Sequence, residues 1–144
     1  MNEIAGVLSG TGVTLGLIPC GSGDGLGRHL GIHGPVDRAL DLLQTGRPHD
    51  IDTGFADGHA FFTAAGIGFE AEIARRFNQL DRRGFARYLS TSAQTFRDWQ
   101  PQEYRVSQGS GQTSVHAFTL AVANANQYGN NARIAPAACI DDGE

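Results

Sequence analysis

A glycine-rich loop, Pro19–Gly25, constrains this chain more than any other feature. It follows an apolar run, Val13–Ile18, and leads into residues from Leu26 onward that favour a helix. The apolar run predicts a buried strand, so the expected order is strand, glycine loop, helix. Such a loop offers backbone N–H groups to a phosphate, and its glycines allow close approach. The sequence predicts an anion site here, and the alternative is a glycine-rich turn with Asp24 as the helix N-cap.

Two common nucleotide-binding patterns do not fit this loop. Leu26 stands three residues after Gly23, and Arg28 stands three after Gly25, so the G-x-G-x-x-G fingerprint is absent. The eleven basic residues are all arginine, whereas a P-loop needs a lysine for its phosphates. A net charge of −4 argues against a nucleic-acid partner. Residue chemistry alone therefore stops at anion binding.

Beyond the loop the pattern changes from α/β to mainly β. Gly34-Pro35 begins a helix and Gly46 ends it, because proline suits the first helical turn and glycine suits the residue after the last. Strand patterns follow, and Asp57-Gly58 between two of them is a strong hairpin signal. The expected strands are Ile51–Ala56, His59–Ala65, Glu103–Ser107 and Val115–Ala123. We place a domain boundary near Asp50.

Two helical stretches interrupt these strands. Their apolar residues recur at helical spacing from Ile73 to Leu80 and from Phe85 to Phe96. The large side chains of Tyr88, Phe96 and Trp99 are expected in the core. The same region is rich in arginine, which predicts a solvated helix face, with contact to anionic headgroups as the alternative. These arginines are Arg75, Arg76, Arg82, Arg83 and Arg87.

The two cysteines and the hydropathy pattern indicate a cytoplasmic setting. Cys20 and Cys139 are far apart and lack CxxC or metal-ligand spacing, which suits a reduced compartment. No apolar run approaches the ~20 residues that a membrane-spanning helix needs. The five histidines show no ligand spacing and are read as surface or structural groups; they are His29, His33, His49, His59 and His116.

Several motifs together resemble the diacylglycerol and sphingosine kinase superfamily. Leu17–Leu26 is similar to its "IP-x-G-[TS]-G-N-D/A/G" loop, and Ile51–Gly54 is similar to its "IDlG" segment. Phe61–Glu70 resembles "F-x-n-x-aG-x-Gfda". The late "N-x-x-x-yG-g…iaP-x-A…DG" stretch is matched by Asn124-Ala125-Asn126, Tyr128-Gly129, Ile134-Ala135-Pro136 and Asp142-Gly143. Segments in this order cover nearly the whole chain, so chance does not explain them.

This resemblance implies a fold of two parts. Residues 1–50 would be the C-terminal part of a Rossmann-like nucleotide-binding domain. Residues 51–144 would be the N-terminal part of the β-rich, β-sandwich-like second domain. The family's "GGDGT" nucleotide loop would lie before Met1, and its general base far downstream. We therefore expect a truncated piece of the enzyme that is inactive by itself.

The resemblance also implies an activity and its residues. The family transfers the ATP γ-phosphate, with Mg²⁺, to a lipid hydroxyl such as that of diacylglycerol, by positioning and electrostatic stabilisation. Gly21, Ser22, Gly23 and Asp24 would bind the nucleotide. Asp24 replaces the family's usual asparagine and could compensate for Gly25, which stands where many members carry an aspartate.

Two further acidic residues match family positions. Asp52 would support a network of carboxylates, water and magnesium, with a turn-capping aspartate as the alternative. Asp142 would bind a structural magnesium together with the backbone oxygens of Cys139 and Glu144, with a simple Asp-Gly turn as the alternative. The protein would contact the inner face of the membrane peripherally, and its oligomeric state stays open.

Two other functions stay open at this point. One is an enzyme similar to NAD kinase with a soluble acceptor, because that family shares the glycine-loop logic. The late Asn124–Asn126 and Ile134–Pro136 segments favour the lipid branch. The other is a non-catalytic module that binds lipid or nucleotide, which the departure at Gly25 leaves possible.

Overall fold

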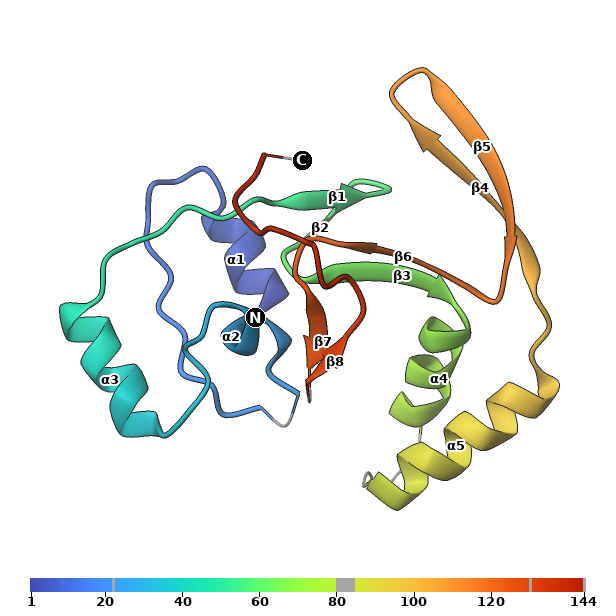
Figure 1. Cartoon of the computed structure of the whole chain (residues 1–144), viewed down its shortest axis with the longest axis horizontal. Helices are drawn as coiled ribbons and strands as arrows, with labels where there is room; N and C mark the ends of the chain where they lie inside the picture. Colours follow the sequence, from blue (N-terminus) through green and yellow to red (C-terminus); the bar gives the residue numbers. More distant parts are fainter. Residues whose placement is uncertain (22, 80–84, 130, 144) are drawn as a thin grey trace. The chain divides into compact units, whose positions relative to one another are not determined.

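The structure is a computed structural model, and it describes residues 1–21, 23–79, 85–129 and 131–143 (Figure 1). Helices come first and strands dominate later. The helices are α1 (Asn2–Leu8), α2 (Gly25–His29), α3 (Val36–Thr45), α4 (Phe69–Asn78) and α5 (Phe85–Asp98). The strands are β1 (Gly54–Ala56), β2 (His59–Phe61), β3 (Ala64–Gly68), β4 (Gln102–Gln108), β5 (Gly111–Ala117), β6 (Thr119–Ala123), β7 (Gln127–Gly129) and β8 (Ala132–Arg133).

The strands pair two by two. Among the described residues the sheets are β1–β2, β3–β6, β4–β5 and β7–β8. The chain forms two compact units: Met1–Ala65 with Ala123–Glu144, called unit 1, and Gly66–Val122, called unit 2. Unit 1 is thus assembled from two separate stretches of sequence, and the loop and the late motifs belong to the same unit.

The core of unit 1 joins those two stretches. Leu26 of α2, Ala125 and Ile140 are buried together, and they come from both stretches. Partly buried side chains pack against this cluster, from Leu17, Leu30 and Ile51. The loop before α2 is consequently held against the C-terminal stretch by apolar burial, the main favourable term in folding.

The hairpin predicted at Asp57-Gly58 is confirmed. β1 and β2 are antiparallel, with Ala56 opposite His59. Asp57 and Gly58 have φ values of 50° and 78°, the left-handed pair that a tight two-residue hairpin turn needs. The Asn2 side-chain amide of α1 donates to the carbonyl of Ala60 in β2 at 3.3 Å, so α1 lies beside this hairpin.

The strand predicted at Val13–Ile18 is wrong. This segment has no strand partner within the described residues, and Val13 is 59 % exposed. A buried parallel strand needs neighbours that satisfy its backbone and cover both of its faces. Here the Leu43 side chain of α3 lies directly over Gly16 and Leu17 packs against the core cluster, but neither contact is a strand pairing. A Rossmann-like sheet is therefore not shown.

The other early elements follow the prediction. α2 begins at Gly25, one residue before the expected position, and α3 runs from Val36 to Thr45 with Pro35 before it and Gly46 after it. The apolar side of α3 is more exposed than expected. Its exposed large residues are Val36, Leu40, Leu42 and Leu43.

Unit 2 contains the predicted pair of helices and two strands that form a hairpin. α4 and α5 pack on each other, and β4 pairs with β5 from Gln102↔Ala117 to Gln108↔Gly111. An aromatic cluster lies beside them, with the Phe69 and Phe118 rings 4.6 Å apart and the Phe96 ring 5.6 Å from Phe118. The Trp99 indole N–H donates to the carbonyl of Phe118 at 2.9 Å.

Two details of unit 2 differ from the sequence prediction. The strand expected at Val115–Ala123 is interrupted at Phe118, so β5 pairs with β4 and β6 pairs with β3. Tyr88 and Phe96 are not core residues, since 47 % and 65 % of their surface is exposed. Helical spacing gives the face on which residues lie, but what covers that face is decided by packing. None of the described helices is long and apolar enough to cross a membrane.

Candidate functional site

The glycine loop is docked onto β7 through close backbone contacts. Asp24 and Gly129 form an isolated antiparallel bridge. A Cβ added at Gly25 would lie 2.5 Å from the carbonyl oxygen of Tyr128, and one added at Gly129 would lie 2.8 Å from the carbonyl of Gly23. Glycine is therefore needed on both sides of this contact, because backbone atoms cannot move aside cheaply.

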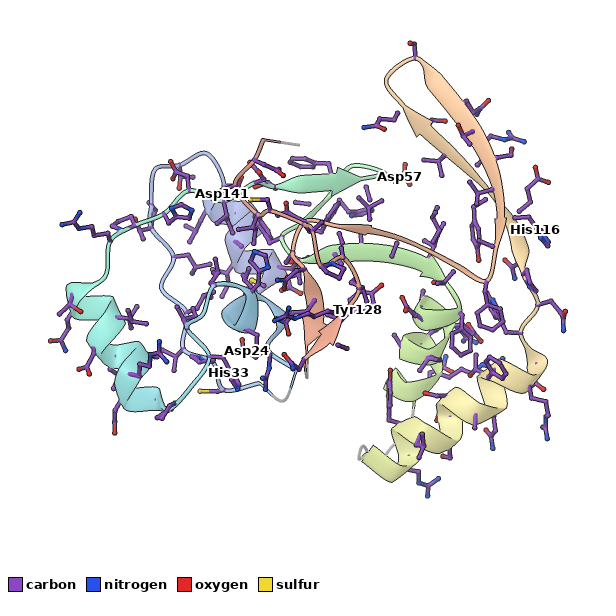
Figure 2. The ribbon with its side chains drawn as sticks, in the orientation of Figure 1. Asp24, His33, Asp57, His116, Tyr128 and Asp141 are labelled. Carbon is purple, nitrogen blue, oxygen red and sulfur yellow. The ribbon has the colours of Figure 1, made fainter. Side chains whose placement is uncertain are left out.

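Asp24 has an unusual backbone and a shielded side chain. Its φ and ψ are 46° and 51°, in the left-handed region that aspartate and asparagine tolerate best among non-glycine residues. It precedes α2, but its carboxylate makes no cap hydrogen bond. Instead Oδ2 accepts from Nδ1 of His33 at 2.7 Å (Figure 2). Both carboxylate oxygens would lie 2.5 Å from a Cβ at Gly27, so that residue too must be small.

Two other side chains hold the loop and α2 in place. The Arg28 guanidinium donates through Nε to the carbonyl of Gly23 at 3.2 Å. The backbone N–H of Asn126 donates to Nδ1 of His29 at 3.0 Å. These bonds connect the last turn of α2 to its own loop and to the C-terminal stretch.

A cavity of about 500 Å³ opens beside the loop. One wall is the loop itself and the start of α2, with Gly21, Asp24 and Gly25. The remaining walls are largely apolar and also carry Thr63 and Tyr128. The other lining residues are Met1, Leu17, Ile18, Pro19, Cys20, Leu26 and Ala64. A mostly apolar cavity with a few polar groups at one side is the usual form of a small-molecule site.

Asp52 ties three segments of unit 1 together. Its carboxylate accepts from the backbone N–H of Gly143 at 2.8 Å, and its own N–H donates to the carbonyl of Ile140 at 2.7 Å. The side-chain amide of Asn124 donates to the Asp52 carbonyl at 2.9 Å and to that of Phe62 at 3.2 Å. The fold thus brings Asp52 next to the Asp-Gly pair, which lies 91 residues away in sequence.

The C-terminal segment carries a second polar cluster. Asp141 accepts from the Cys139 thiol at 3.2 Å and from Nε2 of His49 at 2.9 Å. The Cys139 contact is the main cause that lowers the pKa of Asp141, and the same hydrogen bond raises the pKa of the Cys139 thiol. A thiol with a raised pKa is a poor nucleophile. This cluster is therefore a surface tie between two segments.

The predicted metal residues were tested against this geometry. Asp142 is exposed, and Glu144 lies outside the described residues. Within the described part of the chain, no three His, Cys, Asp or Glu side chains are grouped to hold a metal ion. A site built from one carboxylate and backbone carbonyls needs no such group, and oxygen donors of this kind suit Mg²⁺. The donor chemistry at Asp142 therefore fits magnesium.

The structure brings several predicted residues to one place. Gly21 and Asp24 line the cavity, while Gly23 contacts β7 behind it. Ser22 lies outside the described residues. The sequence did not predict the roles of His29 and His33. Their hydrogen-bond partners lie 97 and nine residues away, and no local pattern indicates such contacts.

Two protein-family models match this chain. Residues 1–56 match the family model described as diacylglycerol kinase catalytic domain. Residues 63–144, more than half of the chain, match the YegS C-terminal NAD kinase beta sandwich-like domain. The chain therefore belongs to the family of YegS-like lipid kinases and diacylglycerol kinases.

Individual relatives point the same way. The chain is 31% identical to a probable lipid kinase YegS-like of Chromohalobacter salexigens, over 99% of this chain and 48% of that protein. It is 30% identical to a diacylglycerol kinase of Mycobacterium tuberculosis, over 95% of this chain and 47% of that protein. It thus spans about half the length of these curated relatives. No solved structure matches the chain significantly.

Proposed function

We propose that this chain forms part of an ATP-dependent lipid kinase that transfers the γ-phosphate to a lipid hydroxyl, such as that of diacylglycerol. The observation that carries the proposal is the cavity bordered by the glycine loop. The chain that contains this cavity belongs to a lipid-kinase family. Phosphoryl transfer depends mainly on positioning and electrostatics, which a rigid loop can supply. Gly21, Ser22, Gly23 and Asp24 are proposed to contact ATP.

Asp52 and Asp142 are proposed to support the reaction, and Asp142 belongs to the Asp142-Gly143 pair. The Asp52 carboxylate already holds the backbone N–H of Gly143, so a change at Asp52 would displace the neighbouring Asp142. Mg²⁺ held by Asp142 and the backbone oxygens of Cys139 and Glu144 would supply positive charge that fixes this segment. In this proposal Asp52 positions the C-terminal segment around Asp142 and does not itself react with the substrate.

The setting is proposed to be the cytoplasmic side of the membrane, with peripheral contact to lipid. The finding that no described helix could span a bilayer is compatible with contact from the surface. The chain contains no "GGDGT" sequence and no match to the family's general base. We therefore propose that these 144 residues bind nucleotide but do not turn it over.

The first test is nucleotide binding by the 144-residue chain. We expect saturable binding of ATP with Mg²⁺ and a rise in Tm, because a ligand that binds only the folded state stabilises it. Radiolabelled phosphate on diacylglycerol after incubation with this chain alone would contradict the proposed lack of turnover. Failure of ATP to bind at millimolar concentration would contradict the nucleotide site itself.

The second test addresses the reaction class. A chimera would carry these 144 residues in place of the matched 48% of the Chromohalobacter salexigens relative. We expect it to label diacylglycerol or another lipid alcohol and to lose most of this activity when Asp52 is changed to Ala. Labelling of NAD in place of lipid would instead favour the soluble-acceptor enzyme, whose β-sandwich the second family match names.

A further inference from the structure

The Asp24 carboxylate lies beside a loop that is proposed to receive phosphates, and that placement is unfavourable for an anion. Like charges at short range repel strongly unless a cation or a hydrogen-bond donor balances one of them. The side chain of Asp24 is only 14 % exposed, so water balances it incompletely. Some group of the protein must hold this carboxylate.

His33 is that group. Its Nδ1 lies 2.7 Å from Oδ2 of Asp24, and because an ionised carboxylate can only accept, the imidazole must donate. The contact joins two residues nine positions apart, from the residue that precedes α2 to a residue beyond its end. Figure 2 shows the two side chains next to each other.

His33 is itself anchored and does not reach in from a free loop. Its backbone N–H donates to the carbonyl of Gly27 at 3.0 Å, and the N–H of Ile32 donates to the same carbonyl at 2.8 Å. The imidazole is 37 % exposed and contacts the site through Asp24. An anchored donor can hold the Asp24 carboxylate in one orientation.

The orientation of Asp24 sets the backbone of the glycine loop. Asp24 is the left-handed residue at which the chain turns from the loop into α2, and its backbone is bridged to Gly129. Its carboxylate lies over Gly27, where no larger residue would leave room. Side chain and backbone of Asp24 are thus fixed by separate contacts, and His33 is the side-chain partner.

We propose that His33 is a positioning residue for the nucleotide loop: it donates to Asp24 and so holds the left-handed turn at Asp24, beside the cavity that Gly21 and Asp24 line. This rests on the proposed function. Asp24 then serves the nucleotide site through its conformation and not as a magnesium ligand. The pairing explains how this chain accommodates an aspartate where its family usually has an asparagine.

The test compares two substitutions of His33 in the 144-residue chain. His33→Ala removes the donor, whereas His33→Asn keeps an N–H donor at nearly the position of Nδ1. We expect His33→Ala to weaken Mg²⁺–ATP binding about tenfold, as loss of a charge-assisted hydrogen bond would. His33→Asn should stay within about threefold of the original chain.

A matched control is His116→Ala, since His116 lies on β5 in unit 2 (Figure 2). It should leave ATP affinity unchanged. His33→Ala that lowers Tm yet binds ATP as tightly as the original chain would overturn the proposal, since His33 would then be merely structural. Equal weakening by His33→Ala and His33→Asn would overturn it as well.

Asp24→Asn separates positioning from metal binding. Asparagine tolerates the left-handed conformation and retains a side-chain oxygen for His33, so any change in ATP affinity should be the same with and without Mg²⁺. A selective loss of the Mg²⁺-dependent part of binding would make Asp24 a metal ligand and overturn the proposal.

Hydrogen exchange keeps this inference separate from the proposed function. Without nucleotide, His33→Ala should speed amide exchange in residues 23–28, and His33→Asn should not. If the original chain binds no ATP, the proposed function fails. In that case the exchange rates by themselves test whether His33 holds the loop. Unchanged rates in His33→Ala would overturn the proposed role of His33.

Discussion

At the scale of single residues, the contact between Gly25 and β7 is the tightest constraint on the loop. A Cβ at Gly25 would lie 2.5 Å from the Tyr128 carbonyl oxygen and 2.9 Å from that of Gln127. Both obstacles are backbone atoms of a paired strand. This contact gives a physical reason why the chain lacks the aspartate that many family members carry at this position.

We predict that Gly25→Ala lowers the free energy of unfolding by about 1–3 kcal/mol, the usual effect of an atom forced into a filled space. Urea denaturation measures the change. Gly21→Ala is the control, because nothing lies within 4 Å of a Cβ there, and it should change stability by less than about 0.5 kcal/mol. Equal stabilities for the two variants would mean that the loop is not docked on β7.

Asn124 offers a second residue-scale prediction. Its amide satisfies the carbonyls of Asp52 and Phe62, and its surface is 7 % exposed. Asn124→Ala leaves both acceptors without this donor and should destabilise unit 1 by about 1–3 kcal/mol. Asn2→Ala removes an exposed amide contact to Ala60. It should lower the free energy of unfolding by less than about 1 kcal/mol in the same thermal or urea titration.

At the scale of elements, α4 is stabilised by one carboxylate between two arginines. Glu72 accepts from Nε of Arg75 at 2.7 Å and from Nε of Arg76 at 2.6 Å. Arg76 also reaches Asp98 of α5 at 3.8 Å. Hydrogen bonds from Arg75 and Arg76 lower the pKa of Glu72 to about 2. The basic segment of the sequence is therefore partly neutralised by its own helix pair.

This pKa gives a pH prediction for the helix pair. Because the folded pKa of Glu72 lies below its unfolded value of ~4.3, the stabilisation is complete above that value and is lost as pH falls towards 2. The Tm difference between the original chain and Glu72→Gln should be largest at pH 6 and should shrink steadily between pH 4.5 and 2. A difference that is constant over this range would show that the ion pairs do not contribute.

The elements also show which patterns in a sequence are reliable. The turn at Asp57-Gly58 and the helices α4 and α5 were predictable because their signals lie within a few residues: φ > 0 at a two-residue turn, and apolar spacing of three to four. The strand at Val13–Ile18 was not, because an apolar run becomes a strand only when another segment pairs with it. Phe96 shows the same limit for burial.

At the scale of the whole molecule, unit 1 is discontinuous, since Met1–Ala65 is completed by Ala123–Glu144. Leu26 of α2 is buried by Ala125 and Ile140 from the second stretch. The site therefore depends on residues from both stretches, and the first stretch alone lacks Ala125 and Ile140 of the core cluster.

We predict that a chain ending at Val122 loses the structure of α2. Without Ala125, Asn126 and Ile140, Leu26 and His29 lose their partners, and a five-residue helix is too short to persist unsupported. Hydrogen exchange should show the amides of Arg28–Leu30 protected in the full chain and unprotected in the shortened one. Protection that survives the deletion would contradict the discontinuous unit.

The sequence by itself determined the family, the helix-rich beginning and strand-rich continuation, and the tight turns, because these depend on short-range backbone preferences and on ordered motifs. The sequence motifs also indicated Asp52, the Asn124 region and Asp142, but not the contacts that these residues make in the fold. Only the tertiary structure shows that Asp52 accepts a hydrogen bond from Gly143 and that His33 donates one to Asp24. It also shows that the position of Gly25 leaves no room for a side chain. Hydrogen bonds and close backbone approach join residues up to 106 positions apart, Gly23 with Gly129 among them, and no local pattern encodes such distances.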